Sequence, residues 1–246
     1  TGGCEISLIA AIDYTGSNGD PDMPSSLHYI SPTGAWNPYQ EAILSVGKIL
    51  DAYDTDKSYP VYGFGAKMHK EDGSMSEALH CFPVNPDGTF EVKGVSGIME
   101  AYAASVKKLF FSGPTLFAPL INQSISVAAG ANCRQEKQKY TVLLIITDGT
   151  INDMEATKAA IVAASSQPIS IIIIGVGSAD FSAMTALDSD KGLLSAGGKT
   201  ATRDVVQFVA RTNQEFAVLA QKVLAEIPDQ VLTYMEQHHI KPNKKA

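Results

Sequence analysis

The stretch Cys4-Glu-Ile-Ser-Leu-Ile-Ala-Ala-Ile12, followed directly by Asp13-Tyr-Thr-Gly-Ser17, decides the fold of this chain. An apolar run of this kind predicts a strand that is buried on both faces, as in a parallel sheet covered by helices. Open parallel sheets bind their ligands in the crevice beyond the carboxyl ends of the strands. The polar residues that follow the run are therefore expected to lie in a functional crevice.

The rest of the chain alternates between apolar runs and segments with helical spacing. This rhythm predicts an α/β fold with a doubly wound, mostly parallel sheet and helices on both faces. A short antiparallel edge strand is expected at residues 26–30, and residues 67–93 are expected to form an irregular connection. Further buried strands are expected at residues 59–64, 140–147, 169–176 and 205–209, and helices at residues 38–51, 95–109, 116–129, 152–164, 182–187 and 215–236, with a break near Pro228.

Two sequence signals suggest where these helices begin. Asn37 and Pro38 form an N-cap and first-turn pair, and Asn152 with Glu155 matches the capping-box pattern. Gly198-Lys199-Thr200 resembles the end of a phosphate-binding loop, but Leu193 stands where that motif requires glycine, so we expect an ordinary loop there.

Length and composition predict one large domain. The chain has 246 residues, of which 45% are hydrophobic, and we expect a single domain at residues 1–240 with a disordered basic tail at residues 241–246. The net charge of -7 leaves no basic field that would attract nucleic acid or an anionic membrane. The abrupt start in a strand leads us to expect that upstream modules are absent from this sequence.

The cysteines and histidines offer no catalytic pattern. Cys4, Cys81 and Cys133 contain no C-x-x-C pair, which disfavours both a disulfide framework and a zinc site. A reducing compartment, the cytoplasm or the nucleus, is therefore expected. His28 and the other histidines lack triad spacing with a serine or cysteine, so we expect structural or solvated roles.

Oxygen-bearing side chains follow two of the strongest predicted strands. Asp13, Thr15 and Ser17 alternate within one turn after the first strand, and Asp148 follows residues 140–147. Thr115, just before a predicted helix, can reach the same crevice. Two carboxylates and three hydroxyls suit one Mg²⁺ or Mn²⁺ ion, and Ca²⁺ less well. Because five groups cannot all coordinate an open site, one or both aspartates are expected to act through bound water, leaving the cation able to attract a partner's carboxylate.

This order of residues resembles the metal-ion-dependent adhesion site of von Willebrand A domains. Six stretches resemble the copine branch of these domains in particular, and the similarity extends over nearly the whole chain. The resemblance implies that Thr15, Ser17 and Thr115 contact the cation, with Asp13 and Asp148 completing the site directly or through water. The stretches are residues 13–21, 26–30, 62–66, 113–115, 206–209 and 223–228.

The resemblance also implies a function. Copines carry two calcium-dependent phospholipid-binding modules before this domain, so membrane binding would belong to those missing modules. This domain would then be a non-enzymatic protein-binding module that recruits an acidic partner to membranes, in trafficking or signalling. We expect a cytoplasmic protein with calcium-dependent recruitment to membranes; the oligomeric state and the partner's identity stay open.

Two alternatives remain at this stage. A cation in such a crevice could polarise a phosphoryl oxygen, as in a metal-dependent enzyme acting on phosphate esters, although no general base is evident. Some plant proteins join a similar domain to a RING module, which suggests the client-binding domain of a ubiquitin-ligase-like protein. With three cysteines, this sequence carries no RING of its own.

Overall fold

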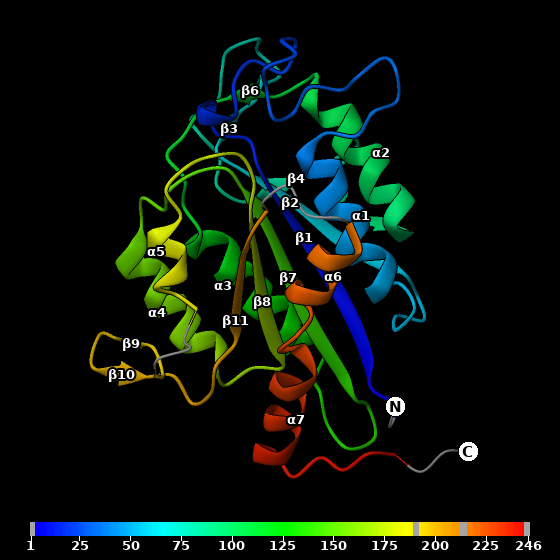
Figure 1. Cartoon of the computed structure of the whole chain (residues 1–246), viewed down its shortest axis with the longest axis vertical. Helices are drawn as coiled ribbons and strands as arrows, with labels where there is room; N and C mark the ends of the chain where they lie inside the picture. Colours follow the sequence, from blue (N-terminus) through cyan, green and yellow to red (C-terminus); the bar gives the residue numbers. More distant parts are fainter. Residues whose placement is uncertain (1–2, 189–191, 212–215, 244–246) are drawn as a thin grey trace.

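The centre of the molecule is a mostly parallel sheet (Figure 1). The computed structural model describes residues 3–188, 192–211 and 216–243. Within these residues the strand order is β11-β8-β7-β1-β2-β4, with β5 also paired to β2. The parallel strands are β1 (Glu5–Asp13), β2 (Ser58–Phe64), β7 (Lys139–Thr147), β8 (Ile169–Gly175) and β11 (Val206–Ala210), while β4 (Phe82–Pro83) and β5 (Glu91–Lys93) run antiparallel to β2.

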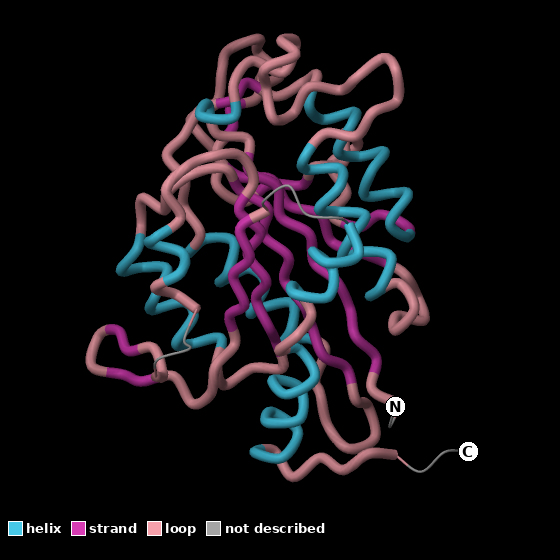
Figure 2. Tube along the Cα trace, viewed as in Figure 1, coloured by secondary structure: helices cyan, strands magenta, loops and turns pink. Residues whose placement is uncertain are grey.

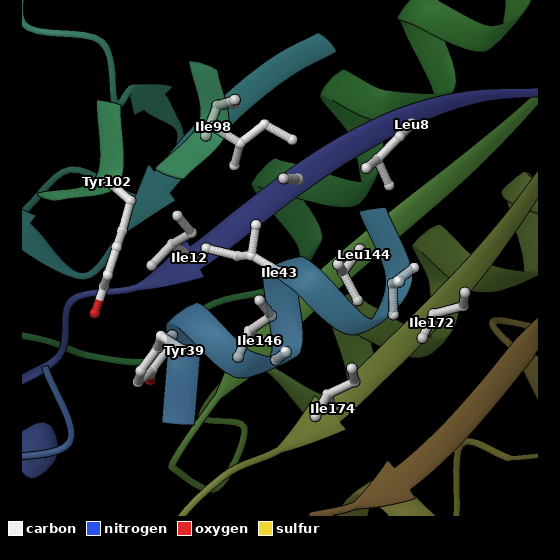
Figure 3. Packing of buried hydrophobic residues seen from close by; sticks show 14 of the residues in the cluster. Leu8, Ile12, Tyr39, Ile43, Ile98, Tyr102, Leu144, Ile146, Ile172 and Ile174 are labelled. Carbon is white, nitrogen blue, oxygen red and sulfur yellow. The ribbon is translucent and has the colours of Figure 1, made fainter. Parts of the chain in front are cut away.

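Helices cover both faces of the sheet, as the sequence predicts (Figure 2). One face packs against α1 (Pro38–Leu50), α2 (Gly94–Val106) and α6 (Phe216–Val223), and Figure 3 shows Ile43 of α1 among side chains of the strands. The other face packs against α3 (Ala118–Gly130), α4 (Met154–Ala164) and α5 (Ser182–Thr185). The predicted doubly wound α/β fold is therefore confirmed.

The first strand is central because its residues are apolar on both faces. Leu8, Ala10 and Ile12 pack under α1, whereas Ile9 and Ala11 face the layer of α3 and α4. β1 lies between β2 and β7, and all three strands run parallel. Their carboxyl ends therefore meet at one edge of the sheet, and the loops that follow them are brought together there.

The predicted edge strand at residues 26–30 is wrong. In the structure these residues form turns, because their backbone bonds to the preceding loop instead of to a sheet edge: the Leu27 N–H donates to the Asn18 carbonyl oxygen, and the Ser26 hydroxyl donates to the same oxygen. The antiparallel strands at the edge are β4 and β5, which lie in the connection expected to be irregular.

Short elements complete the chain. The turn of 3-10 helix η1 (Gly16–Asn18) follows β1, and β3 (Ala66–Lys67) pairs with β6 (Phe110–Phe111). The Gly198-Lys199-Thr200 stretch lies in the hairpin of β9 (Ser195–Ala196) and β10 (Lys199–Thr200), where Gly197 and Gly198 have φ of 57° and 75°. A tight hairpin favours glycine at such angles, which explains this stretch without a phosphate.

The last helix and the end of the chain lie away from the loops that follow the parallel strands. The helix α7 (Ile227–Gln237) begins just before Pro228, which confirms the expected break. Lys241 donates its backbone N–H to the Gln135 side chain, and the Gln135 amide donates to the side chain of Asn243. This part of the expected tail is therefore attached to the loop before β7, and residues 244–246 lie outside the described residues. In the described part of the chain, no helix has the length and apolarity that crossing a membrane requires.

Candidate metal centre

The residues expected to bind metal meet at the carboxyl ends of β1 and β7. Asp13 is the last residue of β1, and Asp148 directly follows β7. These ends lie opposite the chain termini, toward the loops that carry β3 and β6 (Figure 1). Thr15, Ser17, Thr115 and Asp148 line a cavity of about 700 Å³, whereas Asp13 lies beneath it with no exposed surface.

A chain of short hydrogen bonds joins four of these residues. The Ser17 hydroxyl donates to Asp148 Oδ1 at 2.8 Å and accepts from the Thr15 hydroxyl, with the two oxygens 3.0 Å apart. The Thr15 N–H donates to Asp13 Oδ1 at 2.8 Å, and the Thr147 hydroxyl donates to Asp13 Oδ2. Both carboxylates are therefore oriented by neutral donors.

Thr115 is placed near the same point through Gly149. A methyl group built on Gly149 would lie 3.5 Å from Thr115 Oγ1 and 3.6 Å from Ser17 Oγ, so both hydroxyls border the same small space. The structure thus brings Thr15, Ser17, Thr115 and Asp148 around one cavity, with Asp13 directly below. Their role as metal ligands stays a prediction.

Both carboxylates of the site are buried, and no described cationic side chain forms an ion pair with either of them. Desolvation raises the pKa of Asp13 to about 6, against the opposing effect of the Thr147 and Thr15 hydrogen bonds, and the nearby charge of Asp148 raises it further. Desolvation also raises the pKa of Asp148. Neither carboxylate belongs to any ion pair between described residues. A cluster of oxygen donors with uncompensated negative charge fits a hard divalent cation.

The loop that carries Thr115 is held by residues after β7. The Thr115 N–H donates to Asn152 Oδ1 at 2.8 Å, and the Asn152 N–H donates to the Thr115 carbonyl oxygen at 2.9 Å. Asp153 accepts from the first N–H groups of α3, those of Phe117 and Ala118. The predicted capping box of Asn152 and Glu155 is therefore wrong, because Asn152 binds the loop before α3, and Asp153, the N-cap of α4, makes no side-chain capping bond to it.

Asn18 is a site residue that sequence reasoning missed. Its amide donates to Asp148 Oδ1 at 3.0 Å and to the Thr15 carbonyl oxygen at 3.1 Å, while its Oδ1 accepts from the Tyr39 hydroxyl at 2.7 Å. Asn18 thus ties the two loops of the site to the start of α1. An asparagine in a loop rich in Gly, Asp and Ser carries no sequence signal that would have distinguished it.

His28 is a buried side chain that binds the backbone of the site at the end of β1. It is fully buried, and it donates from Nε2 to the Asp13 carbonyl oxygen and accepts at Nδ1 from the Tyr102 hydroxyl. Its ring stacks on Tyr39 with the centroids 3.9 Å apart. Burial lowers the pKa of His28 to about 3, so the ring is neutral. The expected structural role of this histidine agrees with these contacts.

Replacing Asn18 by alanine is expected to loosen the site. The change leaves Asp148 and the Tyr39 hydroxyl without one buried partner each, which costs about 1–3 kcal/mol for each unsatisfied group. We therefore expect a clear drop in the urea midpoint of unfolding. Tyr39→Phe, which removes the bond to Asn18 alone, should cost less. Equal losses in the two variants would contradict this role of Asn18.

The fold and the position of the site define the class of protein. A doubly wound sheet with oxygen donors in the loops after β1 and β7 and before α3 is the arrangement of a von Willebrand A domain. The Copine family profile matches residues 26–243. The chain belongs to the copine family.

Two relatives of known sequence illustrate the similarity. Protein BONZAI 1 and Protein BONZAI 2 of Arabidopsis thaliana are each 47% identical to this chain over 245 residues, which is 98% of the chain and 41% of each relative. The chain thus spans about two fifths of the length of these curated relatives. Among solved structures, proximal thread matrix protein 1 of the mussel byssus aligns with a TM-score of 0.49 and 15% identity, over 90% of this chain and 47% of that one.

Proposed function

We propose that this domain binds one Mg²⁺ or Mn²⁺ ion and, through it, a carboxylate of a protein partner. The observation that carries the proposal is the cluster of oxygen donors at the cavity, which holds two carboxylates and no cationic side chain among its described residues. The residues that would hold the ion are Asp13, Thr15, Ser17, Thr115 and Asp148.

The hydrogen bonds support separate roles for these residues. Ser17 uses its proton to bind Asp148 and one lone pair to accept from Thr15, which leaves one lone pair of its oxygen for a cation. Asp13 does not line the cavity, and both of its oxygens already accept hydrogen bonds, so we assign it an indirect role through water. The bound ion would supply an electrophilic position for an external carboxylate.

The lining of the cavity supports binding over catalysis. Among the described residues that line it, Asp148 is the only one with a side chain that titrates. A phosphate-ester hydrolase needs a group that activates its nucleophile. Asp148 is assigned to the ion, and the hydroxyl, amide and apolar side chains around the cavity offer no other general base. The domain would therefore hold a partner without turning it over.

The proposal extends to the whole protein. Because this chain spans 41% of its relatives' length, calcium-dependent phospholipid binding is assigned to modules outside it. In that arrangement the protein is cytoplasmic, moves to membranes when calcium rises, and carries there whichever partner this domain holds in trafficking or signalling.

Immobilised wild-type domain and its Ser17→Ala variant provide the test. In Mg²⁺ the wild type is expected to retain proteins from a cytosolic extract that EDTA releases, and the variant is expected to retain at least tenfold less of them. The variant should keep the wild-type circular dichroism spectrum, because Ser17 is exposed. Equal retention by the two proteins, or magnesium-dependent hydrolysis of p-nitrophenyl phosphate that the variant loses, would overturn the proposed function.

A further inference from the structure

A second and larger cavity lies beside the candidate metal centre. It has a volume of about 1120 Å³, and Gly19, which follows η1, lines both this cavity and that of the metal centre. Gly16 lines it too. Both cavities therefore border the loop that carries Thr15 and Ser17, and the larger one is called the groove below.

An aromatic side chain stands exposed in this groove and is nevertheless held in place. Phe110 is 47% exposed, but its backbone pairs with Lys67 in the two-stranded sheet of β3 and β6. Its ring also meets the His69 ring edge-on, with the centroids 4.9 Å apart. Met68 and Phe111 line the groove next to it. Aromatic side chains of this kind are enriched in protein interfaces.

Two lysines give the groove a basic part in an otherwise acidic chain. Lys107 and Lys108 follow the end of α2, line the cavity and are exposed. Neither takes part in an ion pair between described residues, and the whole chain carries a net charge of -7. Asp20 and Asp22, which line the groove close to the metal loop, would repel acidic groups there.

The stretch of chain from Lys108 to Ser112 limits the distance between the metal loop and the two lysines. Lys108 is joined to Ser112 through β6, and the Ser112 carbonyl oxygen accepts from the Gly16 N–H at 2.6 Å. Four extended residues span at most about 14 Å. An extended partner segment therefore needs no more than about five residues to pass from the metal loop to the lysines.

We propose that this groove binds an extended segment of a partner protein with an acid, apolar, acid pattern. The first acidic side chain binds the cation, a neutral apolar side chain packs against Phe110, and a second acidic side chain no more than about five positions away pairs with Lys107 and Lys108. This inference rests on the proposed function, because it names the partner chemistry for the same metal centre.

A displayed library of nine-residue segments, with one fixed aspartate and the remaining positions random, tests the pattern. Selection on the domain in Mg²⁺ is expected to enrich an apolar residue between the fixed aspartate and a second acid no more than about five positions away. Selection on the double variant Lys107→Glu, Lys108→Glu should lose the second acid alone. Phe110→Ser is expected to weaken the best segment about tenfold.

Two matched variants serve as controls. Lys137→Glu changes an exposed lysine, and Leu232→Ser an exposed apolar residue that is 54% exposed on α7; both lie outside the groove and should bind the selected segment like the wild type. Selected segments without a second acid, or with one that the lysine variant still selects, would overturn the groove proposal. So would an absence of enrichment, or binding of anionic phospholipid vesicles that the lysine variant alone loses.

The two proposals fail in different ways. If the acid, apolar, acid pattern is selected equally well in EDTA and on the Asp148→Ala variant, the proposed function is wrong, because the first acidic side chain then does not bind a metal ion. If the selected segments need Mg²⁺ and Asp148 but ignore Phe110 and both lysines, the proposed function stands and the groove inference is overturned.

Discussion

Saturating Mg²⁺ is expected to raise the melting temperature of this domain by about 5–10 °C, and Asp148→Ala is expected to abolish the shift. An ion at about a hundred times its dissociation constant adds about 2.7 kcal/mol to the stability of the folded state. For a domain of this size, each kcal/mol corresponds to about 2–4 °C. Asp148 is half of the negative charge at the site and accepts from Ser17, so its loss removes both a charge and the orientation of a hydroxyl.

Thermal unfolding in EDTA, Mg²⁺, Mn²⁺ and Ca²⁺ measures this effect. The largest shifts are expected with Mg²⁺ and Mn²⁺, because a site with few direct protein ligands and several bound waters suits a small octahedral ion, whereas Ca²⁺ takes about six to eight oxygen ligands. Asp20→Ala is the matched control, since it removes an exposed carboxylate that lines the neighbouring groove and not the metal cavity. An Asp148→Ala protein that still responds fully to Mg²⁺ would refute the assignment of this residue.

Gly65→Ala is expected to destabilise the domain by about 2–5 kcal/mol and to weaken cation binding. Gly65 has φ of +79°, where an alanine costs about 1–2 kcal/mol. A methyl group built there would also lie 2.3 Å from Thr15 Cγ2 and 3.2 Å from the Thr15 backbone nitrogen. Relieving that overlap costs about 1–3 kcal/mol more and moves Thr15 away from Ser17.

Gly73→Ala is the control that separates the backbone cost of a positive φ from the cost of the overlap with Thr15. Gly73 has nearly the same φ, +81°, but a methyl group built there would meet nothing within 4 Å. This control therefore carries the backbone cost alone and should lose about 1–2 kcal/mol without any change in the cation titration. Urea unfolding and a Mg²⁺ titration of both variants provide the measurement. Equal losses in the two variants would show that the contact with Thr15 is unimportant.

The fold was accessible from sequence because its strands are strongly patterned. Residues 4–12 and 140–147 are apolar on both faces, and this property by itself requires a covered, central, parallel strand. The edge of the sheet was less accessible. β4 and β5 are too short to show periodicity. Residues 26–30 resemble a strand, although the Leu27 N–H donates to the Asn18 carbonyl oxygen and not to a neighbouring strand.

The candidate site also contains residues whose position the sequence predicts and residues whose position it does not. Asp13, Thr15, Ser17 and Asp148 follow strands that the sequence predicts, so their convergence at one edge of a parallel sheet was predictable. Thr115 was named for its hydroxyl, but its position depends on two hydrogen bonds with Asn152, which the sequence assigned to a helix cap.

By itself, the sequence determined the class of fold and the set of oxygen-bearing side chains at the candidate site, because these follow from local apolar patterning and from residue types at strand ends. Its resemblance to copines indicated the family, which the family profile confirms. The tertiary structure alone decided which residues support that chemistry. Asn18 reaches Asp148 across 130 positions of sequence, and His28 reaches the Asp13 carbonyl oxygen from inside the core. Hydrogen bonds between distant segments depend on how loops fold over the sheet, and no local pattern encodes that arrangement.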